Sequence, residues 1–439
     1  MKKSSPPNWK RRANNWSRGN EWRGMSVTRT TELPAGWRMA RVGDILKIRN
    51  GYAFKSTDYQ ESGAPLIRQS ELRSEVVDTS EAKRVDPRFL TELAGFTIRE
   101  GDLLIGMSGS LGKIAEYQEK EPALQNQRTG LLLLKSGYDA KFAKLVLNFV
   151  EPQIVAEGKG VAVQNVSAKE IEDCTFALPS PDEQRRIVAE IEKQFTRLEA
   201  GVAALRRVQV NLKRYRAAVL KAACEGRLVP TKTTWPQKQI ATAIQTMVQG
   251  WSPKCESEPS DDDATWAVIK TTAIQNLRFV EVENKKLPAS LKPRAHLELQ
   301  SGDLLVTRAG PRNRVGVACL VKSTRPRLML CDKAYRLRCK PAVAAPAFLE
   351  LVLNAPQIVD EVNKLKTGIS DSGVNLTQKR FGELLVPLPP LAEQTRIVAE
   401  VERRLSVVEE LESVVTANLQ RATRLRQSIL QKAFTGELT

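Results

Sequence analysis

The sequence LPSPDEQRRIVAEIEKQF at residues 178–195 returns as LPPLAEQTRIVAEVERRL at residues 388–405. The repeat runs without a gap to YRAAVLKAACEGRL (215–228) and LRQSILQKAFTGEL (425–438), at a constant offset of 210 residues. Each copy begins with prolines, carries apolar residues at coiled-coil spacing and has a glycine near its end, which is typical of one long helix. The repeat therefore predicts two tandem halves, each ending in such a helix.

Each predicted helix has an apolar stripe that is unfavourable in water, and about 40 residues would make it roughly 60 Å long. Two helices of equal length would bury their stripes against each other, and antiparallel pairing would place one globule at each end. The alternative is that each helix packs on its own globule. The residues expected at the helix pair and its partner surface are Glu183, Gln184, Ile187, Ile191, Phe195, Leu198 and Leu205, with Glu393, Gln394, Ile397, Val401, Leu405 and Val408 in the second copy.

The remaining sequence predicts two α+β globules built on one plan. Short β-like runs are separated by Gly, Asn and Ser turns, and GDLLI at 101–105 matches GDLLV at 302–306. Asn165-Val166-Ser167 likewise matches Asn375-Leu376-Thr377. The predicted segments are a basic, disordered tail at 1–32, a globule at 33–180, a helix at 181–228, a globule at 229–389 and a helix at 390–439. For the tail, a mis-annotated start before Met25 is the alternative.

The charge of the chain is unevenly distributed. The 439 residues carry a formal net charge of +18, of which 1–32 contribute +6, 181–228 contribute +5 and 229–390 contribute +8, whereas 33–180 sum to −1. A patchy basic surface favours a polyanionic partner such as a nucleic acid. A basic protein without a directed surface is the alternative.

Composition argues against several other classes. No apolar run approaches the length of a membrane span, and the six cysteines form no CxxC pair while His296 is the single histidine. We therefore expect no metal site and a reducing, cytoplasmic location. The Gly-rich segment at 106–114 lacks the spacing and the Ser or Thr of a phosphate loop, so it predicts a turn. No methyl-donor fingerprint is evident, which argues against catalysis on this chain.

The ordered set of motifs resembles the specificity subunits of type I restriction–modification systems. The resemblance extends from about Leu33 onward and includes GYAFKS at 51–56. Its most specific parts are the two EQxRIVAEIE-like helix starts (183–192 and 393–402) and the two helix endings (220–228 and 430–438). The second half departs from the family pattern, because nothing after Trp235 repeats GYAFKS and an acidic insert occupies 255–263. Trp266–Lys270 aligns only loosely with Ala64–Arg68.

The resemblance implies a fold and a set of partners. The fold would be α+β, with two target-recognition domains separated by two long antiparallel coiled-coil helices in a pseudo-twofold repeat. Each domain would read half of a split, asymmetric site in double-stranded DNA. The helices would set the gap, close to one helical turn of DNA, and dock two modification subunits, through which restriction subunits join. S-adenosylmethionine, ATP and Mg²⁺ would belong to those adenine-methyltransferase and endonuclease partners, and this chain would be non-catalytic.

Bases are read by short polar side chains and arginines, and phosphates are bound by Lys and Arg. Amides in the first globule suit adenine, and arginines in the second suit guanine. A solvated surface role is the alternative for every one of these residues. The candidates in the first globule are Asn50, Tyr52, Lys55, Ser56, Arg68, Gln69, Arg73, Ser108, Ser110, Lys113, Gln125, Asn126, Gln127 and Arg128; those in the second are Arg308, Arg312, Asn313, Arg314, Lys333, Tyr335 and Arg336.

Two other functions compete with a DNA-reading subunit. One is a self-contained DNA methyltransferase or nuclease with unrecognised motifs, and the other is a coiled-coil scaffold that does not bind DNA. The basic cluster within the first helix (Arg206, Arg207, Lys213, Arg214 and Arg216) is expected to be solvated, with DNA phosphates or a partner subunit as the alternatives.

Overall fold

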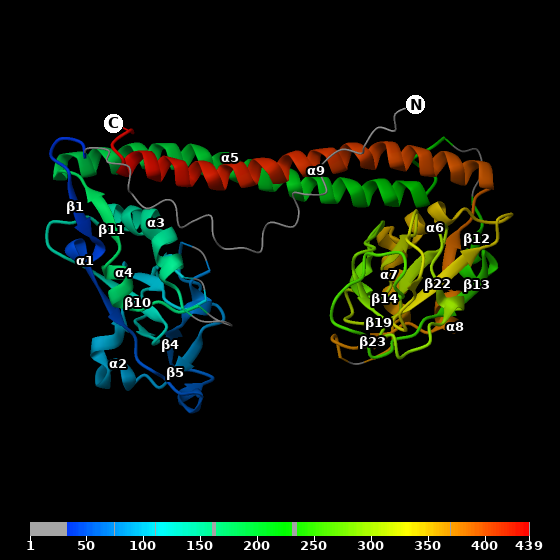
Figure 1. The fold of residues 1–439 in the computed structure, drawn as a ribbon, viewed down its shortest axis with the longest axis horizontal. Coiled ribbons are helices and arrows are strands. Elements are labelled where there is room, and N and C mark those ends of the chain that lie inside the picture. Colours follow the sequence, from blue (N-terminus) through cyan, green and yellow to red (C-terminus); the bar gives the residue numbers. More distant parts are fainter. Residues whose placement is uncertain are drawn as a thin grey trace. The chain divides into compact units, whose positions relative to one another are not determined.

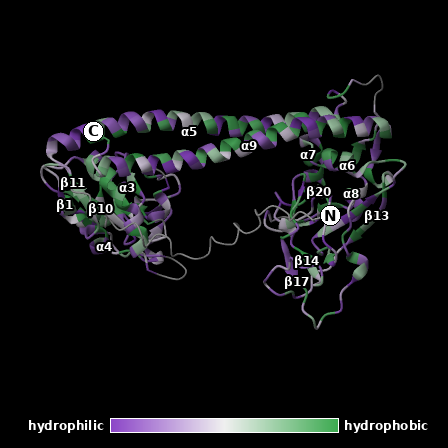
Figure 2. Cartoon of the chain, turned by 45° about the horizontal axis from the view of Figure 1, so that its top comes forward, coloured by the Kyte–Doolittle hydropathy of each residue, from purple (hydrophilic) through white to green (hydrophobic). Residues whose placement is uncertain are grey.

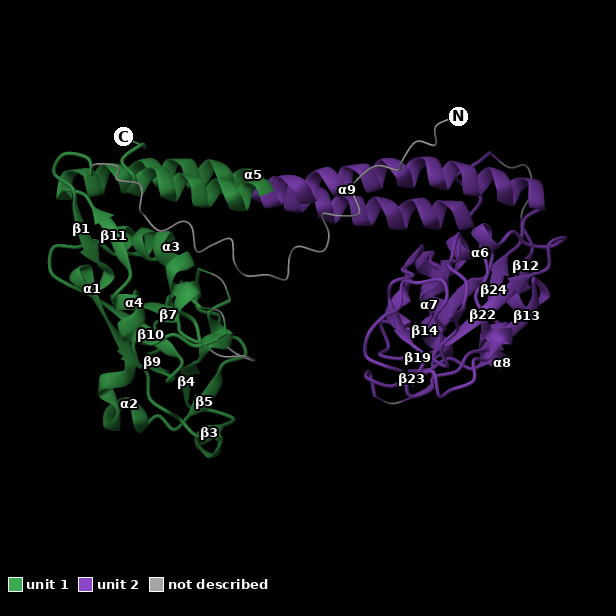
Figure 3. Cartoon of the chain, viewed as in Figure 1, with its two compact units in different colours: residues 1–201, 421–439 green, residues 202–420 purple. Residues whose placement is uncertain are grey.

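The computed structural model describes residues 33–438 except 74, 110, 160–163, 231–234 and 369. The chain forms two compact units (Figure 3): unit 1 combines Met1–Gly201 with Arg421–Thr439, and unit 2 is Val202–Gln420. Both units mix helices and strands (Figure 1), as the repeat predicts. The tail predicted at 1–32 and the candidate Ser110 lie outside the described residues.

Unit 1 contains three sheets. A four-stranded sheet has the order β2-β10-β7-β8, a five-stranded sheet has the order β3-β5-β4-β9-β6, and β1 pairs with β11. The β4–β9 pair is parallel, whereas the pairs of the four-stranded sheet are antiparallel. The strands are β1 (Arg38–Arg41), β2 (Leu46–Asn50), β3 (Tyr59–Gln60), β4 (Ala64–Ile67), β5 (Lys83–Val85), β6 (Thr97–Ile98), β7 (Leu103–Gly106), β8 (Ile114–Glu116), β9 (Ala123–Gln125), β10 (Thr129–Leu134) and β11 (Thr175–Leu178). The helices are α1 (Val42–Ile45), α2 (Phe89–Glu92), α3 (Ala140–Glu157) and α4 (Ala168–Glu172).

Unit 2 repeats the central part of this plan. Its four-stranded sheet, β13-β22-β18-β20, follows the same strand sequence as β2-β10-β7-β8, and the β14–β21 pair is parallel like β4–β9. The strands are β12 (Gln237–Gln239), β13 (Ile244–Gln249), β14 (Ala267–Ile269), β15 (Ile274–Gln275), β16 (Arg278–Phe279), β17 (Asn284–Lys286), β18 (Leu304–Thr307), β19 (Ala309–Gly310), β20 (Ala318–Leu320), β21 (Leu328–Met329), β22 (Ala334–Cys339), β23 (Val374–Asn375) and β24 (Leu385–Pro387). The helices are α6 (Pro346–Leu353), α7 (Pro356–Leu365) and α8 (Gln378–Gly382).

The two long helices are α5 (Pro181–Cys224) and α9 (Leu391–Phe434), each of 44 residues. Both end at a glycine with positive φ, Gly226 at 70° and Gly436 at 79°. The bond from Arg227 N to Ala222 O (3.0 Å) and that from Glu437 N to Lys432 O (2.8 Å) complete these C-terminal caps. The structure thus contains the two long helices of equal length that the repeat predicts.

The Glu-Gln motif anchors the start of each helix to its own globule. Gln184 Nε2 donates to Pro179 O at 3.0 Å, and Gln394 Nε2 donates to Pro389 O at 2.8 Å. Gln394 also accepts from the Ala345 backbone at 2.8 Å. Glu183, Gln184, Glu393 and Gln394, expected at the helix pair and its partner surface, make hydrogen bonds to the segments before the helices and to the globule. Glu183 accepts from Ser180 Oγ at 3.1 Å, and Glu393 accepts from Trp235 Nε1 at 2.7 Å.

The apolar stripes pack both on a globule and on the other helix, so the two predicted alternatives coexist. In unit 1, Ile187 and Ile191 of α5 share a core with Leu430 and Phe434 of α9 and with the globule. The Phe434 ring stacks on Phe149, with ring centroids 4.8 Å apart. Unit 2 is built alike. The long-helix residues in its core are Leu212, Val219, Leu220, Ala223, Cys224, Ile397, Val401, Leu405, Val408 and Val415.

The amphipathic character of the helices is visible in Figure 2, where polar and apolar residues alternate along α5 and α9. Leu198 and Leu205 are half-buried rather than core residues. Several large apolar side chains on the two helices are exposed: Val208, Val210, Tyr215, Val407, Leu411, Val414 and Leu425.

Ion pairs join the two helices at repeat-related positions. In unit 1 Arg426 pairs with Glu199 at 3.1 Å, and in unit 2 Arg216 lies 4.0 Å from Glu409 and 3.0 Å from Glu412. Arg216 is therefore not the freely solvated side chain that the basic cluster predicted. It is a helix-pairing residue.

Candidate nucleic-acid interface

Unit 1 brings its predicted loops together. Tyr52 N donates to Gln125 O and Gln127 N donates to Tyr52 O, both at 2.9 Å, which joins the loop after β2 to the loop after β9. Asn126 N donates to Ile67 O at 3.0 Å, which adds the loop after β4. A hollow of about 350 Å³ is lined by Phe54, Tyr59, Arg68, Gln69, Ser70, Asn126, Gln127 and Arg128. We call this continuous loop surface, together with the adjoining loop at 107–113, face 1.

The loop at 107–113 adjoins face 1 through Gln69. A Cβ placed on Gly109 would lie 3.0 Å from Gln69 Nε2, and a second hollow of about 310 Å³ is lined by Gln69, Ser70, Leu72, Arg73 and Lys113. This loop connects β7 to β8 in an antiparallel hairpin. A phosphate loop leads from a strand into a helix, so the geometry confirms the predicted turn.

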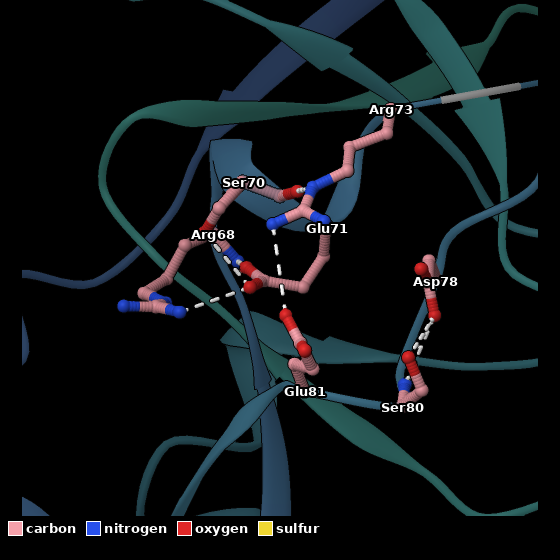
Figure 4. Close-up of polar contacts among 7 residues, drawn as sticks. All are labelled: Arg68, Ser70, Glu71, Arg73, Asp78, Ser80 and Glu81. Atoms are coloured by element: carbon pink, nitrogen blue, oxygen red, sulfur yellow. Dashed lines mark hydrogen bonds and ion pairs between the residues drawn. The ribbon is translucent and has the colours of Figure 1, made fainter. Parts of the chain in front are cut away.

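A buried carboxylate organises the middle of face 1 (Figure 4). Glu71 is 4% exposed and accepts hydrogen bonds from Arg68 N at 2.8 Å, Arg68 Nη2 at 2.9 Å and Ser70 Oγ at 2.8 Å. Arg73 donates from Nε to Ser70 O at 2.8 Å, and its guanidinium lies 3.9 Å from Glu81. Arg68 is therefore fixed within the loop by Glu71. Arg73 is on the surface, where its ion pair with Glu81 is long.

Three face 1 candidates are not placed as predicted. Gln125 is fully buried, and its amide donates to Arg49 O at 2.9 Å and Thr129 O at 2.7 Å, so it locks the loop and has no free donor for adenine. Ser108 is 2% exposed and so is not on the surface, and Asn126, at 7%, is buried except where it lines the hollow. The predicted side chains that remain exposed are Asn50, Tyr52, Lys55, Ser56, Arg73, Lys113, Gln127 and Arg128, with Arg68 and Gln69 half-buried.

Unit 2 has an equivalent surface, and the sequence analysis missed its first element. Trp251 N donates to Leu330 O at 3.0 Å, as Tyr52 N does to Gln125 O. The preceding glycine is equally constrained, because a Cβ on Gly250 would lie 2.3 Å from Leu330 O. Gly250-Trp251 therefore replaces the Gly-Tyr of GYAFKS. The available signal was a glycine followed by an aromatic residue, but it lies 199 residues after its counterpart rather than 210.

Other backbone bonds repeat between the two surfaces. Arg308 N donates to Lys333 O at 2.8 Å, and Met107 N donates to Arg128 O at 3.1 Å at the matching place. Lys270 and Arg68 both directly precede a short 3-10 helix, which supports the loose alignment of β14 with β4. We call the unit 2 surface formed by 250–254, 270–275, 308–314 and 332–333 face 2.

Three of the candidate DNA-binding side chains in unit 2 make hydrogen bonds within the unit instead of facing solvent freely. Arg314 is half-buried and donates to Gln275 Oε1 at 3.2 Å and to two backbone carbonyls, those of Thr271 and Ile274, at 2.9 Å. Tyr335 is 2% exposed, and its hydroxyl donates to a carbonyl at 2.8 Å. Arg336 is 5% exposed and donates to two carbonyls at 2.7 and 3.0 Å. These hydrogen bonds hold the three side chains against their own unit and not toward a ligand.

The surface side chains of face 2 differ from those of face 1. Arg312 is half-buried and pairs with Asp371 at 2.7 Å, while Asn313 and Lys333 are exposed. Arg308 donates to Asp332 O at 3.0 Å, and its guanidinium lies 5.7 Å from the Tyr335 ring centroid. Asp332, which exchanges hydrogen bonds with Ser252, stands where face 1 has Gln127.

No helix among the described residues is long and apolar enough to cross a membrane. In the same part of the chain, no three or more His, Cys, Asp or Glu side chains gather as they would around a metal ion. The described cysteines are free, and burial raises the pKa of the Cys174, Cys224 and Cys339 thiols to about 11, 12 and 11.

Comparisons with known proteins agree with this geometry. Residues 34–204 match the family model for the type I restriction modification DNA specificity domain. The specificity subunits of two Escherichia coli type I restriction enzymes, EcoBI and EcoKI (strain K12), are each 26% identical over 92% and 93% of this chain, and the alignments cover 86% and 90% of those proteins. The EcoEI specificity subunit of Escherichia coli is 38% identical over 200 residues, 46% of this chain and 34% of that protein.

A solved structure shares the fold. A chain from a study of complex assembly and conformational transition of the type I R-M system superposes with a TM-score of 0.65 at 18% identity, covering 92% of this chain and 99% of that one. The family match, the two near-full-length relatives and the repeated units agree with one another. Residues 34–204 match the type I restriction modification DNA specificity domain, and nearly the whole chain is similar to type I restriction enzyme specificity subunits.

Proposed function

We propose that this chain is the double-stranded DNA-binding specificity subunit of a type I restriction–modification complex, with face 1 and face 2 each reading one half of a bipartite, asymmetric site. The observation that carries the proposal is the equivalence of the two faces in backbone but not in side chain. Tyr52 and Trp251 follow constrained glycines at matching places, and Gln127 is matched by Asp332. Two different readers on one scaffold suit a site whose halves differ in sequence.

The exposed chemistry of both faces fits this role. Arg128 and Lys333 suit phosphates, and the amide of Gln127 suits the edge of adenine in the major groove. The carboxylate of Asp332 can accept from the cytosine amino group. The sequence predicts that arginines of unit 2 read guanine, but Arg314 and Arg336 donate to carbonyls of their own unit. We therefore propose that Asp332 and Asn313 contact the bases in this half-site.

We further propose that α5 and α9 act as the spacer between the two reading units and as the docking surface for two modification subunits. Equal helix length and repeat-related ion pairs support a matched antiparallel pair. Restriction subunits would join through the modification subunits, in the cytoplasm. S-adenosylmethionine, ATP and Mg²⁺ would act on those partners, and this chain would contribute specificity rather than catalysis. The rival enzyme and scaffold functions have no observation in their favour.

The direct test is selection of binding sites from a library of random DNA duplexes by the chain assembled with its modification subunits. We expect one motif with two unlike specified parts and a fixed unspecified gap. Affinity for the selected site should fall steeply with salt, because bound phosphates release counterions. Enrichment of no motif, or of a single uninterrupted one, would contradict the proposal.

A second experiment tests the spacer. A seven-residue insertion in each helix, after Val208 and after Asn418, keeps the apolar period and adds about 10 Å to the pair. We expect the gap to lengthen by about three base pairs, at ~3.4 Å per base pair, with both half-site sequences retained. The same insertion in α5 alone is the control and should disrupt the pair. An unchanged gap in the double insertion would exclude the spacer role.

A further inference from the structure

An arginine near the end of α9 joins three elements of unit 1. Arg426 Nη2 lies 3.0 Å from Glu75 of the globule, and Arg426 Nη1 lies 3.1 Å from Glu199 of α5. The same guanidinium sits 4.4 Å from the ring centroid of Phe195, a buried residue of α5. Lys144 of α3 holds the other oxygen of Glu75 at 3.0 Å. Two carboxylates and an aromatic ring thus fix the position of one side chain.

Glu75 connects this cluster to face 1. It follows Arg73 by two positions, and its carbonyl accepts from Glu116 N of β8 at 2.9 Å. Val77 N donates back to Glu116 O at 3.0 Å, so the segment after the Arg73 loop is tied to β8. The strand β8 itself follows Lys113, the exposed residue of the neighbouring face 1 loop. Glu75 is therefore connected to the Arg73 loop by the chain and to the Lys113 loop through β8.

The charge of Glu75 is favoured in this setting. Partial burial raises the pKa of this carboxyl, but hydrogen bonds and charges from Lys144 and Arg426 outweigh burial and leave the pKa below its ordinary value. The carboxylate is consequently ionised at neutral pH and attracts Arg426.

The repeat supplies a natural comparison. Arg216 occupies the position in α5 that Arg426 occupies in α9, and it approaches Glu409 and Glu412 of α9. Among the ion pairs of the described residues, Arg216 has no carboxylate from the unit 2 globule. The helix-pairing contact is therefore common to both units. Both units also have an ion pair from a long helix to the globule, Glu192 with Lys141 and Glu402 with Lys322. Among the described residues, however, Arg426 pairs with the other long helix and with its globule at once, whereas Arg216 pairs with the other long helix alone.

We propose that Arg426 is a positioning residue for face 1. By binding Glu75, Arg426 fixes the positions of the Arg73 and Lys113 loops. These positions in turn determine how strongly unit 1 discriminates its own half-site from altered sequences. The inference rests on the proposed function and deepens it. Because α9 is also the proposed spacer, a change at this end of the helix is expected to act on the half-site that unit 1 reads.

The test compares the substitutions Arg426→Gln and Arg216→Gln in the chain assembled with its modification subunits. Sites are selected from random duplexes, and discrimination is measured against duplexes changed at single positions of each half-site. For Arg426→Gln we expect about 3- to 10-fold weaker discrimination in the half-site of unit 1 and no change in the other half. Arg216→Gln should leave discrimination in both half-sites unchanged.

A second variant separates positioning from folding. Glu75→Gln keeps the Arg426–Glu199 pair and the contact with Phe195, so it should unfold at nearly the same temperature as the parent yet relax the same half-site. In the double variant Glu75→Gln with Arg426→Gln, the loss should be no larger than in either single variant. Equal loss in both half-sites, or unchanged discrimination in a folded Glu75→Gln protein, overturns the inference. If the unsubstituted protein selects no bipartite motif, the proposed function fails instead.

Discussion

Units 1 and 2 share a backbone but not a surface. Main-chain hydrogen bonds repeat at matching places, such as Val166 N to Met107 O at 3.0 Å and Leu376 N to Arg308 O at 2.8 Å. The side chains at matching positions differ; Gln127 of unit 1, for example, corresponds to Asp332 of unit 2. Bonds between main-chain atoms specify loop geometry without reference to the side chains, so recognition residues can change while the loops stay in place. The comparison also offers matched controls, since a substitution in one unit has a counterpart in the other.

The largest predicted difference between the units is the loss of stability when one core residue of a long helix is replaced by alanine. Phe434 is 2% exposed and contacts Phe142, Phe149 and Phe176, whereas the repeat-related residue of unit 2 is Cys224. Phe434→Ala should lower the stability of unit 1 by about 3–5 kcal/mol, because it removes a large buried ring. Thermal unfolding followed by calorimetry measures the loss. Cys224→Ala, which removes one sulfur atom, should cost clearly less, and equal costs would refute the asymmetry.

The second prediction tests whether the two glycines are equally constrained. A Cβ on Gly51 would lie 2.2 Å from Asn126 O, and one on Gly250 would lie 2.3 Å from Leu330 O. Gly51→Ala and Gly250→Ala should each cost about 1–3 kcal/mol through displaced backbone. Each should weaken recognition of only one half-site, measured in the selection assay. Gly201→Ala, where a Cβ meets nothing within 4 Å, is the control and should be neutral or slightly stabilising.

A smaller effect is expected from the exposed basic residues at matching positions. Arg128→Ala and Lys333→Ala should each weaken DNA binding and reduce the slope of log affinity against log salt by about 1, if each contacts one phosphate. Titrations at several salt concentrations give the slopes. A change in base preference at one position without a change in slope would instead assign the residue to base reading.

The smallest predicted effect is the pH dependence of stability that one carboxyl of unit 1, that of Glu170, contributes. Hydrogen bonds from Lys159 and from Ser167 lower the pKa of Glu170 to about 2, below its ordinary value of 4.5. A carboxyl whose pKa is lowered by folding stabilises the protein above its unfolded pKa, and this contribution is lost as pH falls from about 4.5 toward 2. The matching position in unit 2 is Arg380, next to the Thr377 cap.

Urea unfolding of the parent protein and of Glu170→Gln checks this prediction. The parent should be the more stable at pH 6, and the difference should shrink as the pH falls through 4. Arg380→Gln should show no such convergence. A difference that stays constant with pH would mean that the amide disrupts the capping box by its shape rather than by its charge.

The sequence predicted the long helices well because their information is local and repeated. The apolar period, the preceding prolines and the glycines at 226 and 436 all act within a few residues, and the structure confirms the helices within four or five residues at their ends. Predicted strands such as 129–134 are also observed. The hydrogen-bond partners of the Glu-Gln pair could not be predicted from the sequence, because they include globule residues such as Val343 and Ala345 that the fold brings to the helix start.

The candidate faces were predicted less completely, for physical reasons. Gln125 and Gln127 are of one residue type and two positions apart, yet β9 buries the first and leaves the second exposed. Polarity alone cannot separate a side chain that satisfies buried carbonyls, such as Arg336, from one that meets a ligand. Gly250-Trp251 was missed because the spacing of the repeat changes between the globules. Only its main-chain bonds make the equivalence evident.

The composition of unit 1 has a consequence for synthesis of the protein. Its core needs Ile429, Leu430 and Phe434, which leave the ribosome after every residue of unit 2. The N-terminal globule therefore cannot complete its core until the whole of unit 2 has been synthesised. Until then Phe142 and Phe149 lack their contact with Phe434. Unit 2 should thus finish folding before unit 1, and the incomplete first globule on the nascent chain is the state that most needs protection by chaperones.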